Sequence, residues 1–326
     1  MSLQDAIARA ISQATGQHFQ IDDRRGVDGG CINRAETLQS GNRRYFVKYN
    51  DAVRLAMFEA ESDGLIEIAA SKSVRVPQPV CSGAHGGQAY LVLEYIEINR
   101  GTGKADPQGR GSVAGGTTPG MGEVGQRREQ LPRMPGATDE LLGRQLAAMH
   151  RSTRDRFGWH RDNTIGSTRQ INTQEEDWVT FYREHRLRFQ LDLADENGYG
   201  GNLIRRGEQL LEKLPVFFAR YQPLPSLLHG DLWGGNHAAL PDGTPVIFDP
   251  AVYYGDREAD IAMTELFGGY GPGFYAAYNE AWPLDPDYRV RRDLYNLYQV
   301  LNHLNLFGSG YRRQAEQLVD RLLGEL

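Results

Sequence analysis

The chain has 326 residues, of which 40% are hydrophobic and 24% charged, and its formal net charge is −6. This length and composition are typical of a globular protein with one large domain or two lobes, and the acidic balance argues against nucleic acid as a partner. No stretch approaches the roughly 18 consecutive apolar residues that a membrane-spanning helix requires, and the N-terminus lacks the apolar core of a signal peptide. Two cysteines, Cys31 and Cys81, are too few for a disulfide framework, so we expect a cytoplasmic protein without a membrane partner.

The first part of the chain is predicted to be a small, strand-rich lobe. Leu3, Ile7 and Ile11 have helical spacing and predict an amphipathic helix at the start. Five segments rich in β-branched and aromatic residues, bounded by Gly, Asn and Asp turns, are candidate strands: 18–21, 34–39, 44–49, 78–81 and 89–95. A helix at 54–71 interrupts them.

A change of composition follows the last of these strands. Residues 97–137 are rich in glycine, proline and threonine and contain few large apolar side chains. Such a segment buries too little surface to offset the entropy of ordering it. We therefore predict a disordered insertion, with a functional lid as the alternative.

The rest of the chain is predicted to be mainly helical. Helices are expected at 138–151, 175–197, 205–220, 288–307 and 312–323, and residues 226–255 form a compact loop-and-strand region. The sequence thus predicts an α+β, bilobal fold. Its parts are an N-terminal strand-rich lobe that ends in a connector (1–96), the insertion (97–137) and a larger helical lobe (138–326).

The strongest chemical signal lies in the loop-and-strand region. His229-Gly230-Asp231 precedes Asn236 by the spacing of a protein-kinase catalytic loop, and Asp249 follows a short apolar strand. Phosphoryl transfer needs a carboxylate to orient the attacking hydroxyl and hard oxygen ligands for magnesium. Asp231 is the candidate base, and Asn236 and Asp249 are the candidate ligands. The alternative is that these residues only cap turns.

Two further candidates lie in the predicted N-terminal lobe. Lys48 ends an apolar strand, which is the position of the kinase lysine that binds nucleotide phosphates. Glu61 on the next helix is its expected partner. Glu59 is the competitor, but it lies about 200° around the helix from Glu61. Cys31 stands in a Gly-rich turn, where it is either a small buried residue or an exposed, redox-active thiol with a lowered pKa that could link two oxidised chains.

These motifs together resemble the fructosamine kinase (ketosamine-3-kinase) family, which belongs to the aminoglycoside-phosphotransferase-like branch of the protein-kinase-like fold. The resemblance covers nearly the whole chain outside the insertion. Besides the catalytic loop, it rests on short segments spread along the sequence: 57–61, 157–159, 163–166, 178–186, 249–251, 254–258, 260–263, 266–269 and 301–308.

The resemblance implies ATP- and magnesium-dependent phosphorylation of the 3-hydroxyl of a ketosamine, a sugar joined to an amine by glycation. The phosphate makes the adduct labile, so the activity would repair glycated proteins. Carried over by motif, Asp231 is the base, Asn236 and Asp249 are the magnesium ligands, and Trp233 and His303 are the sugar contacts; the ATP-binding residues are Lys48, Glu61, Glu94, Tyr95 and Ile96. Gly29, Gly30 and Cys31, in the turn upstream of Lys48, are further ATP-binding candidates because backbone N–H groups there can approach phosphates, with a plain hairpin turn as the alternative.

Several alternatives remain open at this stage. The acceptor could be another hydroxylated amine, such as an aminoglycoside or a choline-like compound, or the chain could be a regulatory pseudokinase that binds nucleotide. Trp233 could pack in the core, and His303 could be a satisfied helical histidine. The acidic residues Asp256, Glu258, Asp260 and Glu265 either attract a cationic amine or hold the loop to the next helix. The sequence decides neither between free ketosamine and glycated protein lysine nor between monomer and homodimer.

Overall fold

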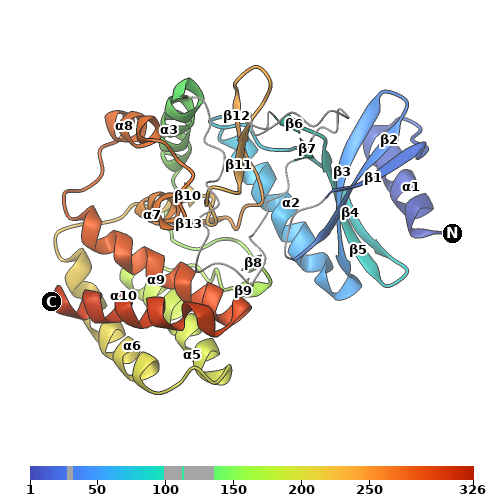
Figure 1. The fold of residues 1–326 in the computed structure, drawn as a ribbon. Coiled ribbons are helices and arrows are strands. Elements are labelled where there is room, and N and C mark those ends of the chain that lie inside the picture. The colour runs from blue at the N-terminus through green and yellow to red at the C-terminus, as the bar shows by residue number, and fades with distance from the viewer. Residues whose placement is uncertain (28–31, 99–111, 114–135) are drawn as a thin grey trace. The chain divides into compact units, whose positions relative to one another are not determined.

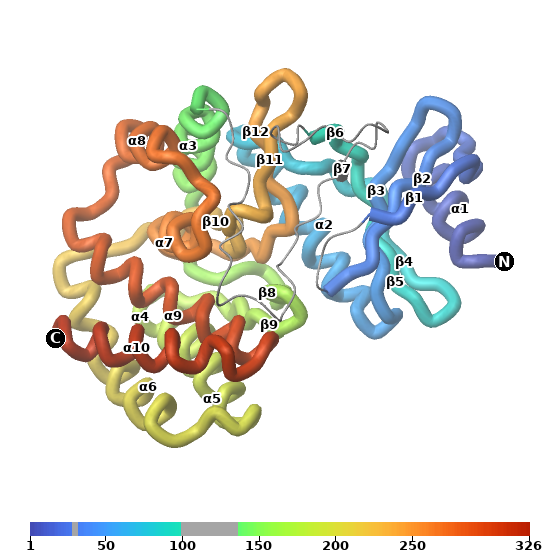
Figure 2. The backbone as a smooth tube through the Cα atoms, in the orientation of Figure 1, coloured from blue at the N-terminus to red at the C-terminus, as the bar shows by residue number. Residues whose placement is uncertain are grey.

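The computed structural model describes residues 1–27, 32–98, 112–113 and 136–326, and these form two compact units. The first unit comprises Met1–Leu146, Trp233–Pro250 and Gly269–Tyr278. The second unit comprises Ala147–Leu232, Ala251–Gly268 and Asn279–Leu326. Figures 1 and 2 follow the chain by colour through both units. The lobe boundaries drawn from the sequence stay a prediction.

A five-stranded antiparallel sheet forms the centre of the first unit, in the order β1-β2-β3-β5-β4. Its strands are β1 (Asp23–Val27), β2 (Arg34–Ser40), β3 (Arg43–Asp51), β4 (Pro79–His85) and β5 (Gln88–Glu94). The last four coincide with predicted strands, but the strand predicted at 18–21 is wrong. The ladder to β2 begins only where the Asp22 N–H donates to the Gln39 carbonyl at 2.8 Å, and Phe19 before it is buried in the core.

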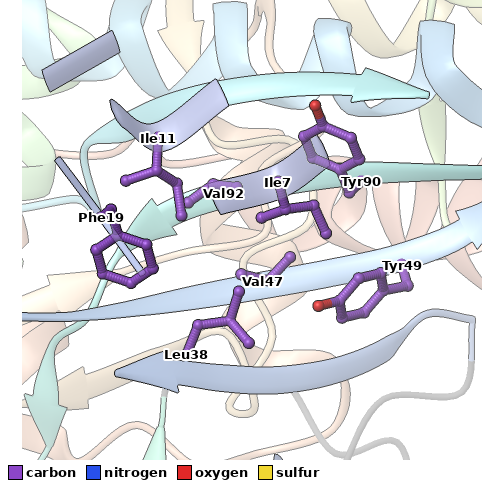
Figure 3. Packing of buried hydrophobic residues seen from close by; sticks show 8 residues of the cluster. All are labelled: Ile7, Ile11, Phe19, Leu38, Val47, Tyr49, Tyr90 and Val92. Atoms are coloured by element: carbon purple, nitrogen blue, oxygen red, sulfur yellow. The ribbon is translucent and has the colours of Figure 1, made fainter. Parts of the chain in front are cut away.

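Two helices cover the two faces of this sheet. In α1 (Leu3–Thr15), which begins with a capping box of Ser2 and Asp5, Ile7 and Ile11 point into a cluster of buried strand residues (Figure 3). Val47 and Tyr49 of β3 belong to this cluster. Because side chains alternate along a strand, Lys48 between them faces the other side, where α2 (Leu55–Ala70) packs.

The remaining elements of the first unit come from three parts of the chain. These are β6 (Glu97–Ile98), β7 (Ser112–Val113), most of α3 (Gly136–His150), β11 (His237–Ala239), β12 (Pro245–Ile247) and most of α8 (Pro272–Ala281). β6 pairs with β7, and β11 pairs with β12, both antiparallel. Residues 99–111 and 114–135 lie outside the described part of the chain, so the disordered insertion stays a prediction.

The second unit is mainly helical. Its helices are α4 (Trp178–Tyr182), α5 (Phe189–Glu196), α6 (Asn202–Lys213), α7 (Glu258–Leu266), α9 (Tyr288–Phe307) and α10 (Arg312–Gly324). Its short strands are β8 (Asn163–Ile165), β9 (Thr168–Gln170), β10 (Ser226–Leu228) and β13 (Tyr253–Gly255). α9 and α10 lie side by side (Figures 1 and 2), and their predicted ranges are confirmed to within a residue. Among the helices described in either unit, none is long and apolar enough to cross a bilayer.

The α1 side chains provide a direct test of the cluster in Figure 3. Ile7 is fully buried there, so Ile7→Ala removes apolar contacts and leaves a cavity. We expect a loss of about 2–4 kcal/mol in the free energy of unfolding, measured by urea denaturation. Ile66→Ala on α2 is the matched control, because Ile66 is 54% exposed. Equal losses in the two variants would contradict the packing described.

Candidate active site

A buried ammonium group held by two carboxylates is the main electrostatic feature of the first unit. Lys48 is 4% exposed, and its Nζ lies 2.6 Å from Glu61 Oε1 and 2.6 Å from Asp249 Oδ1. Burial lowers the pKa of the ammonium, but the two carboxylates outweigh burial and hold the pKa of Lys48 above its ordinary value. Lys48 is therefore a fixed positive charge.

Three separate chain segments meet in this cluster. Lys48 lies on β3, Glu61 one and a half turns into α2, and Asp249 just after β12. Glu61 is the partner that the helical spacing predicts, and the competitor Glu59 lies on an exposed position of the same helix. Burial raises the pKa of Glu61, although Lys48 lowers it.

Asp249 adopts an unusual backbone conformation. Its φ of +58° falls in the left-handed region, which side chains other than Gly adopt at a cost and which is often found at functional sites. The Phe248 N–H donates to the Asn236 carbonyl at 3.1 Å, so a backbone hydrogen bond joins Asn236 to the residue that precedes Asp249. The Asp249 side chain is 27% exposed and thus accessible to a ligand.

The donor set of Asn236 and Asp249 fits magnesium. One carboxylate and one amide oxygen are hard ligands, and Mg²⁺ usually takes one or two such protein groups together with substrate phosphates and water. Lys48, Glu61 and Asp249 carry one excess negative charge when both carboxylates are ionised, which favours a further cation. Among the described residues there is no group of three or more His, Cys, Asp or Glu side chains that could form an all-protein metal cage.

The predicted adenine-binding connector continues directly from β5. The Glu94 carboxylate is paired with Arg75 and accepts a hydrogen bond from the Gln78 N–H at 3.1 Å. Ile96 is 4% exposed and packs in an apolar cluster with Val246 and Phe248. The side chains of Glu94 and Ile96 are thus occupied in fixing the connector.

The Arg44 guanidinium lies over the ring of Tyr95, with Arg44 Cζ 4.2 Å from the centroid of the ring. Gly29, Gly30 and Cys31, the other predicted nucleotide contacts, lie outside the described residues, and so does the proposed redox role of Cys31.

In the second unit, Asp231 ends a tightly constrained loop. Gly230 has φ +82°, and a Cβ there would lie 2.1 Å from the Ala251 carbonyl oxygen, so only glycine fits. The Ala251 N–H donates to the His229 carbonyl at 2.8 Å. The loop backbone before Asp231 is therefore pinned to the segment that follows Pro250.

A buried carboxylate on α7 fixes the same loop from its other side. Asp260 accepts the N–H groups of His229 and Gly230 at 2.7 and 2.8 Å, and its Oδ2 lies 3.2 Å from Nε2 of His150. Burial opposes the charge, yet these donors hold the pKa of Asp260 below its ordinary value. This geometry supports the structural interpretation of Asp260.

The neighbouring acids Asp256 and Glu258 are also fully buried. Asp256 accepts the Tyr221 hydroxyl at 2.9 Å, and Glu258 forms a two-point ion pair with Arg291. They too have structural partners, which leaves Glu265 as the partly exposed acid of the predicted set.

The two predicted sugar contacts are both partly exposed. Trp233 is half-buried, and a Cβ on Gly235 would meet its ring at 2.2 Å, so Gly235 provides the space for the indole. His303 lies on α9 beside Phe267, with ring centroids 4.9 Å apart. Burial lowers the pKa of His303, so the ring is neutral near pH 7. Because Nδ1 donates to the Gln299 carbonyl at 2.8 Å, Nε2 is left as a hydrogen-bond acceptor.

Gln299 is a loop contact that the sequence interpretation missed. Its Nε2 donates to the Gly230 carbonyl at 3.4 Å, next to Asp231. The only sequence signal is its place one turn before His303 on the same helix.

Comparisons with known proteins find similar sequences over nearly the whole chain. The family model described as fructosamine kinase matches residues 3–111 and 131–325. The chain is 44% identical over 318 residues to a Synechocystis sp. protein named "Probable ketoamine kinase", covering 97% of this chain and 96% of that one. It is 40% identical over 312 residues to a chloroplastic protein-ribulosamine 3-kinase of Arabidopsis thaliana, covering 94% and 85%.

Two solved structures are similar to this chain over nearly its whole length. A fructosamine-3-kinase-like protein from Haemophilus somnus 129PT superposes with a TM-score of 0.81 at 25% identity, covering 97% of this chain and 96% of that one. An aminoglycoside phosphotransferase in ternary complex with AMP-PNP and hygromycin B has a TM-score of 0.59 at 15% identity, covering 99% and 98%. That second likeness shows the shared fold.

Glu61 and Glu59 form a natural pair for testing the cation cluster. Glu61→Gln removes one charged partner of Lys48, so the ammonium is less firmly held. We expect a fall of about 10²-fold in kcat/KM for ATP, because small misplacements of a reacting partner have effects of this size. Glu59→Gln is the control and should change it by less than about twofold. A larger loss in the control would rule out the assignment of Glu61.

Gly230 tests the constraint on the catalytic loop. Gly230→Ala forces the loop away from the Ala251 carbonyl and displaces Asp231. We expect kcat to fall by about 10²-fold or more, measured as ATP turnover. Gly310→Ala is the matched control, since a Cβ there meets nothing within 4 Å. Full activity of the Gly230 variant would show that Asp231 does not need this geometry.

Proposed function

Since the chain belongs to the fructosamine kinase family, we propose that it transfers the γ-phosphate of ATP to the 3-hydroxyl of a ketosamine. The observation that carries this proposal is the buried Lys48 between Glu61 and Asp249. A pseudokinase would have little reason to retain three charged side chains in such an arrangement at the cost of burying them.

Asp231 is the proposed catalytic residue on the acceptor side. Its carboxylate orients the sugar hydroxyl and takes its proton as the oxygen attacks the γ-phosphorus. The bond between that phosphorus and the bridging oxygen of ADP breaks, and the phosphoryl group moves to the sugar. Asp260, by holding the backbone of His229 and Gly230, acts as a positioning residue for Asp231.

Lys48 and the connector are proposed to bind the nucleotide. Lys48 supplies a fixed positive charge to the α- and β-phosphates, and Glu61 keeps it in place. The backbone of 94–96 offers hydrogen bonds to the adenine. Asn236 and Asp249 would hold magnesium, which when bound neutralises charge on the phosphate oxygens.

Trp233 and His303 are proposed to contact the acceptor. The Trp233 indole offers a flat surface for the sugar and a cation–π site for the substrate amine. The acceptor nitrogen of His303 can receive a hydrogen bond from a sugar hydroxyl. We further propose a cytoplasmic location, on the basis of the two cysteines, and either a monomer or a homodimer.

The test is ATP consumption with magnesium on ribulose-lysine, fructose-lysine, kanamycin and choline. We expect turnover of the ketosamines and a fall of about 10³-fold or more in kcat for Asp231→Asn, which retains the shape but loses the base. Asp155→Asn, remote from the loop in sequence, is the control and should retain activity. Turnover of kanamycin or choline alone would replace the proposed acceptor, and nucleotide binding without turnover of any compound would contradict the kinase proposal.

A further inference from the structure

A hollow lies in the second unit, and no residue of the catalytic loop lines it. It has a volume of about 330 Å³ and is lined by the C-terminal end of α7, the first half of α9 and the middle of α10. This volume lies at the lower end of the range for small-molecule sites. Apart from Glu265, which the sequence interpretation offers as an attractor for a cationic amine, no residue given a role above lines this hollow, which we call the α9–α10 pocket.

The charged side chains of the α9–α10 pocket are balanced in number. Arg292 contacts Glu265 at 3.1 Å and Asp293 at 3.3 Å, and Arg321 contacts Asp293 at 2.7 Å. Two guanidinium groups thus face two carboxylates. A pocket with both signs and no excess of either suits a ligand that also carries both charges.

A buried polar atom in the pocket lacks a partner. Asn296 is 6% exposed, and its Oδ1 accepts no hydrogen bond from any residue that the structure describes. An unsatisfied buried acceptor is unfavourable, and an N–H group of a ligand that reached it would supply the missing hydrogen bond. Gln314 and Gln317 on α10 add further amide groups to the lining.

The pocket also lies at a defined reach from the proposed sugar contact. Asn296 and His303 are seven residues apart on α9, which places them on the same helix face about 10 Å apart. Leu266 lines the pocket, whereas the next residue, Phe267, stacks against His303. In a ketosamine of lysine, eight bonds join the third sugar carbon to the lysine Cα, an extended span of about 10 Å.

We propose that the α9–α10 pocket binds the α-ammonium and α-carboxylate of a free amino acid that carries the sugar, so that the preferred substrate is the ketosamine of free lysine. This rests on the kinase function proposed above. Asn296 Oδ1 accepts a hydrogen bond from the ammonium. Arg321 uses Nη1 on Asp293, and its 57% exposed side chain presents other N–H donors to the carboxylate.

The test compares two ribulosamines of equal length. One is the Nε-ribulose adduct of free lysine, and the other is the same adduct of Nα-acetyl-lysine methylamide, in which both charges are capped. For the wild-type chain we expect kcat/KM to be about tenfold higher for the free lysine adduct. In Arg321→Gln this ratio should fall towards one, mainly through KM. Arg313→Gln, an exposed arginine of α10 outside the pocket lining, is the matched control and should keep the ratio.

A second variant guards against an indirect effect of the surface change. Asn296→Leu removes the unpartnered acceptor and should lower the same ratio. Equal kcat/KM for the two adducts in the wild type, or a ratio that both pocket variants leave unchanged, would overturn the pocket assignment while the kinase function stands. If neither adduct is phosphorylated, the proposed function fails and the pocket assignment fails with it.

Discussion

The first unit depends on the neutralisation of one buried charge. An ammonium group removed from water costs several kcal/mol unless carboxylates surround it. Lys48 meets this requirement with Glu61 and Asp249, which brings β3, α2 and the segment after β12 to one point. The pairing leaves an excess of negative charge, and this is the physical reason why a metal cation beside Asp249 would stabilise the site rather than disturb it.

The second unit contains a buried anion, Asp260, which backbone and histidine donors stabilise instead of a lysine. Asp260 keeps its charge through two backbone N–H groups and the His150 ring. Burial lowers the pKa of His150, so the ring near pH 7 is neutral, and it can donate its Nε2–H. Because the loop is held through its backbone, these contacts fix the position of Asp231, and its side chain is partly exposed.

The sequence predicted local features well and distant partners poorly. The Lys48–Glu61 pair follows from strand alternation and helical period, and α9 follows from a long periodic segment that ends before Gly308. The helix predicted at 175–197 instead begins at Trp178, where Asp177 caps it, and a π-helical stretch interrupts it at Arg183–Arg188.

The physical reason lies in partners that are remote in sequence. Arg186, in that stretch, is fully buried over the ring of Tyr253, and its Nη2 donates to Asn172 at 2.8 Å. Neither Tyr253 nor Asn172 is a sequence neighbour of Arg186, so local sequence patterns do not predict these contacts. The same holds for the α9–α10 pocket, because its lining comes from three helices, from Glu265 on α7 to Arg321 on α10.

The segment after Asp249 bears on how the protein is controlled. In protein kinases, a long segment after the metal-binding Asp moves and is ordered by phosphorylation. Here Ala251 is fixed through both backbone groups, since its N–H donates to His229 and its carbonyl accepts from Gln170 at 3.0 Å. β13 begins only four residues after Asp249. This leaves no chain length for a movable loop between Asp249 and β13, so this segment is held in place by its own backbone contacts.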